Sequence, residues 1–243
     1  VESRGLGNVY KRQNYNTASA KIYTDLGLFT ANKDINDDVQ DLFNVMTGYG
    51  VVNHYRKLLV SPHTLRPGIT KLIRREIEQH KKHGNGHIII KCNQLVDYEM
   101  VKVLYEASRA GVKIECIVRG ICSLRPGLPG VSDTITVRSI VGRLLEHARI
   151  YYFHNNGDEE MYFGSADLMT RNLNGRIEVL TPLLQENLCN NVMNQIVIPQ
   201  LKDNIHAWVM NSDGSYTKLQ PKKDETVYDS QEEIAKKLNL MKK

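Results

Sequence analysis

Residues in the second half of the sequence could support phosphate chemistry. His147 and Arg149 are two positions apart, so in an extended strand both side chains would point to one face. A neutral imidazole can attack phosphorus or carry a proton near neutral pH, and a guanidinium can bind two phosphate oxygens at once. A turn at residues 155–158 would return Gly164 and Ser165 beside them, where backbone N–H groups and a hydroxyl could approach phosphate oxygens.

Strand and helix patterns alternate in the middle of the chain, and this alternation predicts the framework for these residues. Such alternation favours right-handed βαβ units on a mainly parallel sheet with helices on its faces. The spacing of apolar residues predicts strands over 57–60, 87–92 and 112–118, and helices over 65–83 and 98–110.

The remaining segments predict more strands and three further helices. We expect strands over 19–30, 134–140, 147–153, 160–164 and 177–180, and helices over 35–46, 185–208 and 230–240, the last with Ser230 as its N-cap. The Gly48-Tyr49-Gly50 segment interrupts the pattern and indicates a domain boundary.

Composition indicates a folded protein with an anionic partner. The 243 residues are 41% hydrophobic and 24% charged, which is ordinary for a globular protein. A net charge of +5 suits a nucleotide, a phosphate polymer or a nucleic acid. The apolar runs are far shorter than the roughly 20 residues that cross a bilayer, so we expect no transmembrane segment.

The cysteines indicate a reducing compartment. Cys92, Cys116, Cys122 and Cys189 form no C-x-x-C pair and fall mostly in apolar, strand-like runs, which is typical of reduced, buried thiols. We therefore expect a cytoplasmic protein, with membrane association at most peripheral.

The segment that begins at His147 resembles the H-x-K…G-S-x-N half-motif of the phospholipase D superfamily. Arg149 takes the Lys position and Asp167 the Asn position. In that superfamily a downstream carboxylate orients the histidine, and Glu178 matches its place. A phosphodiesterase normally has two such half-motifs, and no second one is visible in the sequence.

A fuller resemblance, to polyphosphate kinase, extends from Asn14 to about Trp208. The segments that carry it are Asn14-Tyr15-Asn16, Ile22-Tyr23-Thr24-Asp25, Leu59-Val60-Ser61-Pro62, Lys91-Cys92-Asn93-Gln94-Leu95-Val96-Asp97, Val118-Arg119-Gly120-Ile121-Cys122-Ser123-Leu124, Gly130-Val131-Ser132-Asp133, Leu145-Glu146-His147, Gly164-Ser165-Ala166-Asp167, Met169-Thr170-Arg171-Asn172 and Arg176-Ile177-Glu178. The resemblance implies an α/β fold, a phospholipase-D-like mixed sheet flanked by helices, preceded by the tail of a similar domain.

This resemblance also implies the domain organisation. Residues 14–56 would be the remnant of the first catalytic domain, 57–211 the second, and 212–243 a charged tail with a short helix. Residues 1–13 fit neither the family pattern nor any periodicity, and we interpret them as a non-native leader.

The same resemblance implies roles for individual residues. Tyr23, Arg119 and His147 would bind ATP, and His147 would also act in catalysis. The remaining expected site residues are the catalytic Arg149, Glu178, Ser165 and Asp25, with Asp25 orienting a histidine upstream of the chain, and the phosphate or polyphosphate contacts Asn14, Asn16, Arg171 and Asn172.

The implied reaction is the reversible transfer of the ATP γ-phosphate to inorganic polyphosphate through a phosphohistidine. The nucleophilic histidine would lie upstream of Asn14, so we expect the fragment itself to be inactive. Mg²⁺ would compensate phosphate charge, with its ligands also upstream, so no metal ligand is assigned here. ATP, ADP and polyphosphate are the expected substrates, and the enzyme is expected to form homo-oligomers.

Two other interpretations of the same residues stay open. The first is a phospholipase-D-like phosphodiesterase or nuclease that contributes one half-motif per chain to a dimer. The second is a basic nucleic-acid-binding domain, although the sequence lacks the interleaved aromatic and basic residues that stack on single strands. We therefore expect no specific nucleic-acid partner.

Overall fold

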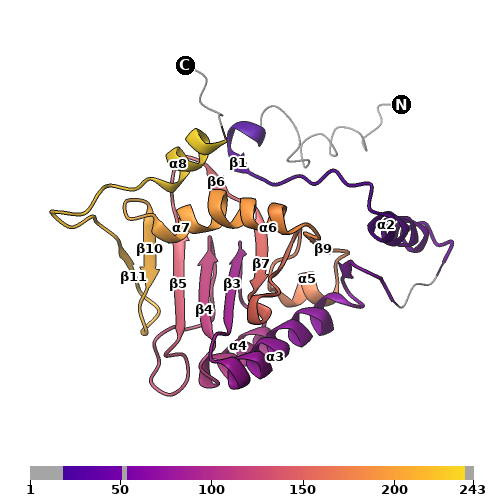
Figure 1. Ribbon diagram of the computed structural model, residues 1–243, viewed down its shortest axis with the longest axis horizontal. Coiled ribbons are helices and arrows are strands. Elements are labelled where there is room, and N and C mark those ends of the chain that lie inside the picture. Colours follow the sequence, from indigo (N-terminus) through magenta and orange to yellow (C-terminus); the bar gives the residue numbers. More distant parts are fainter. Residues whose placement is uncertain (1–18, 51–53, 239–243) are drawn as a thin grey trace, which may run out of the picture.

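A nine-stranded mixed sheet forms the centre of the chain in the computed structural model, which describes residues 19–50 and 54–238 (Figure 1). Its strand order is β11-β10-β5-β4-β3-β7-β8-β9-β2. Its strands are β2 (Leu59–Val60), β3 (His87–Cys92), β4 (Lys113–Val118), β5 (Ile135–Ile140), β7 (Arg149–Phe153), β8 (Glu160–Gly164), β9 (Val179–Pro182), β10 (Ala207–Met210) and β11 (Tyr216–Lys218).

The strand directions correct one expectation and confirm another. Among the described strands of this sheet, β3, β4 and β5 pair in parallel, and all other neighbours pair antiparallel. The expectation of a mainly parallel sheet was therefore wrong, because hairpin connections build most of the second half. The α/β class with a mixed sheet flanked by helices is confirmed.

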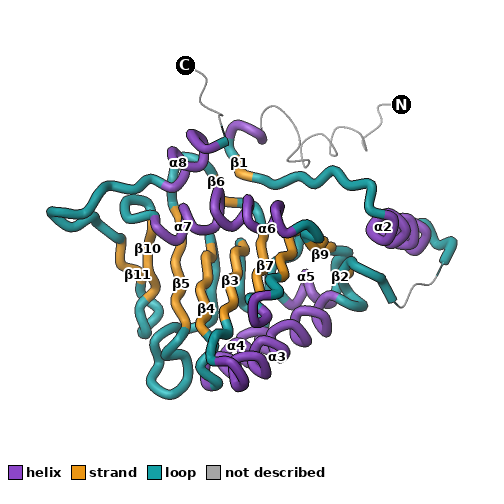
Figure 2. Tube along the Cα trace, in the orientation of Figure 1, coloured by secondary structure: helices purple, strands orange, loops and turns teal. Residues whose placement is uncertain are grey.

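Helices cover both faces of the sheet (Figure 2). One face carries α3 (Leu65–His83), α4 (Tyr98–Arg109) and α5 (Thr170–Asn174), and the other carries α6 (Glu186–Val192), the π-helical turn η3 (Met193–Val197) and α7 (Ile198–Lys202). Strand β3 serves both layers: Ile88 and Ile90 pack with α3 and α4, whereas Ile89 packs with Cys189 and Val197. Alternation along a strand buried on both faces explains this run of apolar residues.

Helix α2 (Lys33–Met46), upstream of the main sheet, is attached to residues 55–60 through apolar contacts and one buried carboxylate. The helix begins at its N-cap Asn32 and buries Ile35 and Leu42 against these residues. The fully buried carboxylate of Asp38 accepts hydrogen bonds from the backbone N–H groups of Arg56, Lys57 and Leu58 at 2.7–3.0 Å. Burial alone would raise the pKa of Asp38, but these bonds outweigh burial and hold the pKa below 3.8.

A second, two-stranded sheet replaces two longer strands that the sequence predicts. In it β1 (Tyr23–Thr24), which follows the short 3₁₀ turn η1 (Ser19–Lys21), pairs in parallel with β6 (Leu145–Glu146). The strand expected over 19–30 therefore shrinks to two residues. The strand expected over 147–153 begins only at Arg149, because residues 145–146 leave the main sheet to pair with β1.

Side chains also explain the wrong end of the helix predicted over 185–208. The helical stretch ends at Lys202, where the Asp203 carboxylate accepts hydrogen bonds from the backbone N–H groups of residues 205–207. Such a side-chain turn competes with further helix and directs the chain into β10. Helix α8 (Ser230–Lys237) is capped by Asp229 rather than by Ser230, whose hydroxyl donates to Asp203 instead.

Other elements match the sequence patterns closely. Helix α3 and strand β3 have the predicted bounds, and the turn over 155–158 contains the 3₁₀ turn η2 (Asn155–Gly157) between β7 and β8. All four cysteines are free, and three of them are buried. Within the described ranges, no helix is both long and apolar enough to cross a membrane.

Gly164 generates a first prediction about stability. A Cβ atom at this position would lie 1.9 Å from the carbonyl oxygen of Val179, because β8 and β9 approach closely there. We expect Gly164→Ala to lower the free energy of unfolding by about 1–3 kcal/mol, since the strands must separate. Urea unfolding would measure this loss. Gly27→Ala is the control, because nothing lies within 4 Å of its Cβ position, and equal losses in the two variants would contradict the prediction.

Asp38 generates a second prediction, on pH dependence. Its lowered pKa means that the ionised carboxylate stabilises the fold above the ordinary carboxyl pKa, and that this stabilisation is lost as pH falls through the folded-state pKa. Asp38→Asn should therefore cost about 1.5–3 kcal/mol at neutral pH and clearly less at about pH 3.

The measurement is urea unfolding of the parent and the variant at both pH values. Asp37→Asn, one residue away and partly exposed, should differ little from the parent at either pH. A cost of Asp38→Asn that stays constant with pH would show that its charge does not stabilise the fold.

Candidate active site

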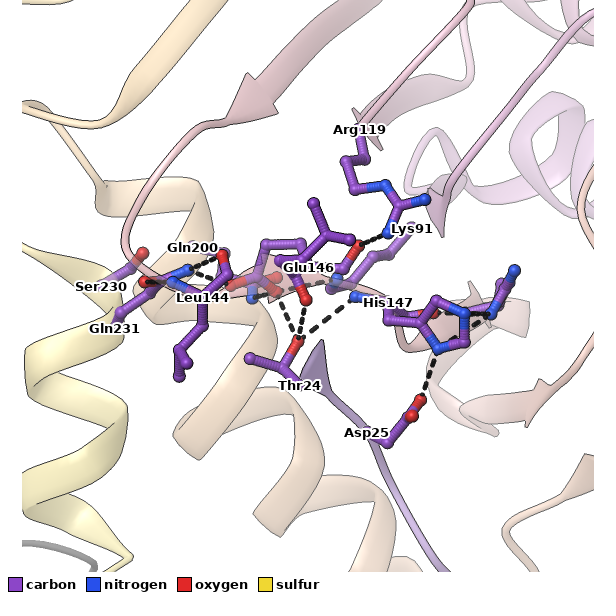
Figure 3. Close-up of polar contacts among 12 residues, drawn as sticks. Thr24, Asp25, Lys91, Arg119, Leu144, Glu146, His147, Gln200, Ser230 and Gln231 are labelled. Carbon is purple, nitrogen blue, oxygen red and sulfur yellow. Dashed lines mark hydrogen bonds and ion pairs between the residues drawn. The ribbon is translucent and has the colours of Figure 1, made fainter. Parts of the chain in front are cut away.

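His147 lies in the link between the two sheets, directly after β6 and two residues before β7 (Figure 3). Its backbone N–H donates to Thr24 Oγ1 at 3.3 Å, which ties the link to strand β1. The imidazole packs edge-on against Tyr23, with ring centroids 5.1 Å apart. The pairing of β1 with β6 thus brings two expected ATP-binding residues together.

A carboxylate and a guanidinium flank the imidazole. Asp25 Oδ1 is 2.9 Å from His147 Nδ1, and Arg149 Nη1 is 3.0 Å from His147 Nε2. A carboxylate can only accept, so Nδ1 donates to Asp25. Arg149 Nη1 also lies 3.3 Å from Nδ1 and donates to the backbone carbonyl of His147 at 2.9 Å, so the guanidinium lies against the ring. Asp25 therefore contacts a histidine of this chain, a partner that the sequence did not indicate.

Arg149 is itself held by a second carboxylate. Its Nε and Nη2 atoms donate to the two oxygens of Asp167 at 3.2 Å each, and Asp167 is 7% exposed. The Asp167 carboxylate also accepts from the backbone N–H of Asn93 at 2.7 Å. A two-point contact fixes the plane of the guanidinium, so the remaining Nη1 is directed towards the imidazole.

Arg119 adds a second positive charge. It follows β4 directly, as predicted, and its Nη1 donates to the backbone carbonyl of Glu146 at 3.2 Å. Burial, followed by repulsion from Arg149, lowers the pKa of Arg119 from its ordinary value. Two guanidinium groups that repel each other at one site favour an anion between or beside them.

A hollow of about 190 Å³ lies beside the imidazole. Its lining consists of Asp25, Leu26, His147, Ala148, Arg149, Phe163, Gly164 and Ser165. Ser165 Oγ accepts from the backbone N–H of Val179 at 3.2 Å, so its own proton can be donated to a ligand. The imidazole of His147, the guanidinium of Arg149 and the hydroxyl of Ser165 therefore meet at this hollow, whereas Arg119 and Tyr23 are not among its described lining residues.

Other expected site residues lie elsewhere or outside the described ranges. Asn172 Nδ2 donates to Glu178 Oε1 at 2.5 Å, and both side chains are buried. Arg171 is exposed on α5. These three are not among the described residues that line the hollow, so their roles stay predictions. Asn14 and Asn16 fall outside the described residues.

The sequence did not predict the buried ion pair that lies next to this site. Lys91 and Glu146 form an ion pair of 3.0 Å whose side chains are 3% and 2% exposed. A lysine directly after Ile88-Ile89-Ile90 in a buried strand was a usable signal, because such a charge needs a partner. Nothing in the sequence identified Glu146 as that partner.

Among the described residues, no group of three or more His, Cys, Asp or Glu side chains could hold a metal ion.

Comparison with known proteins identifies relatives of the chain. Residues 58–231 match the family described as Polyphosphate kinase C-terminal domain 2, and residues 10–52 match Polyphosphate kinase C-terminal domain 1. The polyphosphate kinase of Prosthecochloris aestuarii is 53% identical over 206 residues, which are 85% of this chain and 29% of that protein. That of Parasynechococcus marenigrum is 47% identical over 223 residues, or 92% of this chain and 31% of that protein.

A solved structure agrees with these matches. The crystal structure of polyphosphate kinase from Porphyromonas gingivalis superposes with a TM-score of 0.87 at 40% sequence identity, covering 92% of this chain and 34% of that one. The chain therefore spans about a third or less of the proteins that it matches. On the extent of these matches, the chain belongs to the polyphosphate kinase family.

Proposed function

We propose that this chain forms the part of a polyphosphate kinase active site that binds ATP and assists the reversible transfer of its γ-phosphate to inorganic polyphosphate. The observation that carries the proposal is the imidazole of His147, held between Asp25 and Arg149 at the edge of a hollow lined by donors. ATP and ADP are the nucleotide substrates in the two directions.

Arg119 and Arg149 would stabilise the transferring phosphoryl group. Negative charge on its oxygens remains high in the transition state, and fixed guanidinium donors stabilise it without reorganisation. Asp167 holds Arg149 in place, and Ser165 offers a hydroxyl proton to the same region. Tyr23, packed on the imidazole, presents an aromatic ring at which the nucleotide can bind.

His147 would act as the general acid or base. Asp25 accepts from Nδ1 and so orients the ring, which leaves Nε2 as the nitrogen that exchanges a proton with the substrate. Arg149 would turn from the ring and the backbone carbonyl of His147 to the phosphate when substrate binds, because a guanidinium bonds more strongly to an anion than to a neutral acceptor.

The phosphohistidine of the reaction would form on a histidine outside this chain. The relatives are about three times as long as the matched part, and we place the nucleophile, the Mg²⁺ ligands and any oligomer contacts in their additional domains. The 243 residues alone would then bind nucleotide weakly and turn over nothing.

Two substitutions in the complete enzyme test the proposed roles separately. His147→Gln should lower kcat by about 10²–10⁴-fold, because it removes the proton-transfer group, and should change the KM for ATP little. Arg119→Lys keeps the charge but loses the planar donor pair, so it should lower kcat/KM for ATP. Steady-state assays of polyphosphate synthesis from ATP measure both.

The matched control is His154→Gln, a histidine in the turn after β7 that contacts Tyr152 and Glu159 rather than the hollow. It should retain parental kinetics. Hydrolysis of a phosphodiester without ATP that depends on His147, together with undiminished ATP-dependent synthesis in His147→Gln, would replace the kinase proposal with the phosphodiesterase interpretation.

A separate prediction concerns the chain by itself. Stable phosphorylation of the 243-residue chain by radiolabelled ATP is not expected, whereas nucleotide binding that weakens in Arg119→Ala is expected in calorimetric titration. Phosphate incorporation that is lost in His147→Gln would contradict the proposal, because it would make His147 the nucleophile.

A further inference from the structure

A largely buried hydrogen-bond network adjoins His147 (Figure 3). Its centre is the carboxylate of Glu146, which is the residue before His147. Glu146 Oε2 accepts from Lys91 Nζ at 3.0 Å, from Gln200 Nε2 at 2.6 Å and from Thr24 Oγ1 at 3.2 Å. The network therefore joins β3, α7 and β1 at the residue that precedes the imidazole.

The network positions both Asp25 and His147, because it includes the residue that precedes each of them. Thr24 precedes Asp25 as Glu146 precedes His147, and Thr24 Oγ1 also accepts from the backbone N–H of His147 at 3.3 Å. A shift of the Glu146 carboxylate would therefore move Asp25 and His147, and it would change the contact between their side chains.

The C-terminal helix α8 supplies the last member of this network. Gln231 Nε2 donates to Glu146 Oε1 and to the carbonyl of Leu144, both at 2.8 Å, and Gln231 Oε1 accepts from the N–H of Leu144 at 2.9 Å. A Cβ atom at Gly142 would lie 2.6 Å from Gln231 Oε1, so this glycine makes room for the amide.

Helix α8 is itself anchored to the domain. Asp203, which ends the stretch of α6, η3 and α7, accepts from the N–H and the hydroxyl of Ser230 at 2.9 and 2.7 Å. A cavity of about 250 Å³, lined in part by Gln231, Ile234 and Ala235 of α8 and by Glu146, lies beside the network. If the amide of Gln231 is removed, the Glu146 carboxylate has space into which it can turn.

We propose that Glu146 and Gln231 are positioning residues for His147, through which helix α8 sets the geometry of the imidazole in the phosphoryl-transfer site. This inference rests on the proposed function of His147. The buried Glu146 carboxylate has four hydrogen-bond partners, one of which, Lys91, is a cation. Gln231 is a neutral partner, so it can be changed while the ion pair with Lys91 is kept.

The test compares Gln231→Met with the parent. Methionine keeps the length of the side chain and fills similar space, but it makes none of the three hydrogen bonds of the amide. The matched control is Gln185→Met, the same substitution at an exposed glutamine whose side chain makes no capping bond to α6. Gln231→Glu is the second variant, since it places a carboxylate against the carboxylate of Glu146 and the carbonyl of Leu144.

The first readout is the long-range ¹H–¹⁵N spectrum of the labelled 243-residue chain, with the ring signals of His147 assigned through His147→Gln. We expect both Gln231 variants to move the ring nitrogen signals of His147, because the contact with Asp25 changes, and Gln185→Met to leave them in place. Coincident His147 signals in the parent and in Gln231→Met would overturn the proposal.

The second readout is the kinetics of the complete enzyme that carries the same substitutions. Gln231→Met should lower kcat by about 10–100-fold, the size of effect that a misplaced catalytic group produces, with an unchanged KM for ATP, and Gln231→Glu should lower it further. An unchanged kcat, or a loss that Gln185→Met shares, would overturn the proposal. Full activity of His147→Gln would instead refute the proposed function, and the ring signals would still decide whether Gln231 positions the imidazole.

Discussion

The buried ion pair between Glu146 and Lys91 is the constraint on which the candidate site depends. Removing two charges from water costs several kcal/mol for each ion unless they are paired and every remaining acceptor is satisfied. That demand is met by groups from β1, α7 and α8, which place Thr24, Gln200 and Gln231 around one carboxylate. Residues 145–146 therefore lie outside the main sheet, among these partners. His147 follows them, where the chain returns to the main sheet at β7.

Two guanidinium groups also contact the segment that holds Glu146 and His147. Asp167 balances Arg149, whereas Arg119 donates to the neutral backbone carbonyl of Glu146, and its pKa is lowered by burial and by Arg149. Because the fold already holds two guanidinium groups close together, little rearrangement is needed when a phosphate binds, and the free-energy cost of binding is lower. His147 therefore adjoins both the buried ion pair of Glu146 with Lys91 and the guanidinium of Arg149.

Much of the framework could be predicted from the sequence, because local patterns determine it. Helix α3 follows from apolar periodicity and strand β3 from a short continuous apolar run, and the convergence of His147, Arg149 and Ser165 followed from residue types and spacing. The contact between Asp25 and His147 could not be predicted, since it depends on a two-residue strand pairing without any periodic signal. The helix end at Lys202 was missed because the Asp203 side chain, rather than a glycine or proline, ends it.

The pairing of β1 with β6 also bears on the order in which the molecule folds. Asp25 and His147 are 122 positions apart in the chain. Closing so long a loop costs entropy, which contacts within the folded domain must offset. The sheet with its helices can form from contacts much nearer in sequence, such as the adjacent hairpin strands β7 and β8. We therefore expect the contact between Asp25 and His147 to form only after the strands of the main sheet have paired.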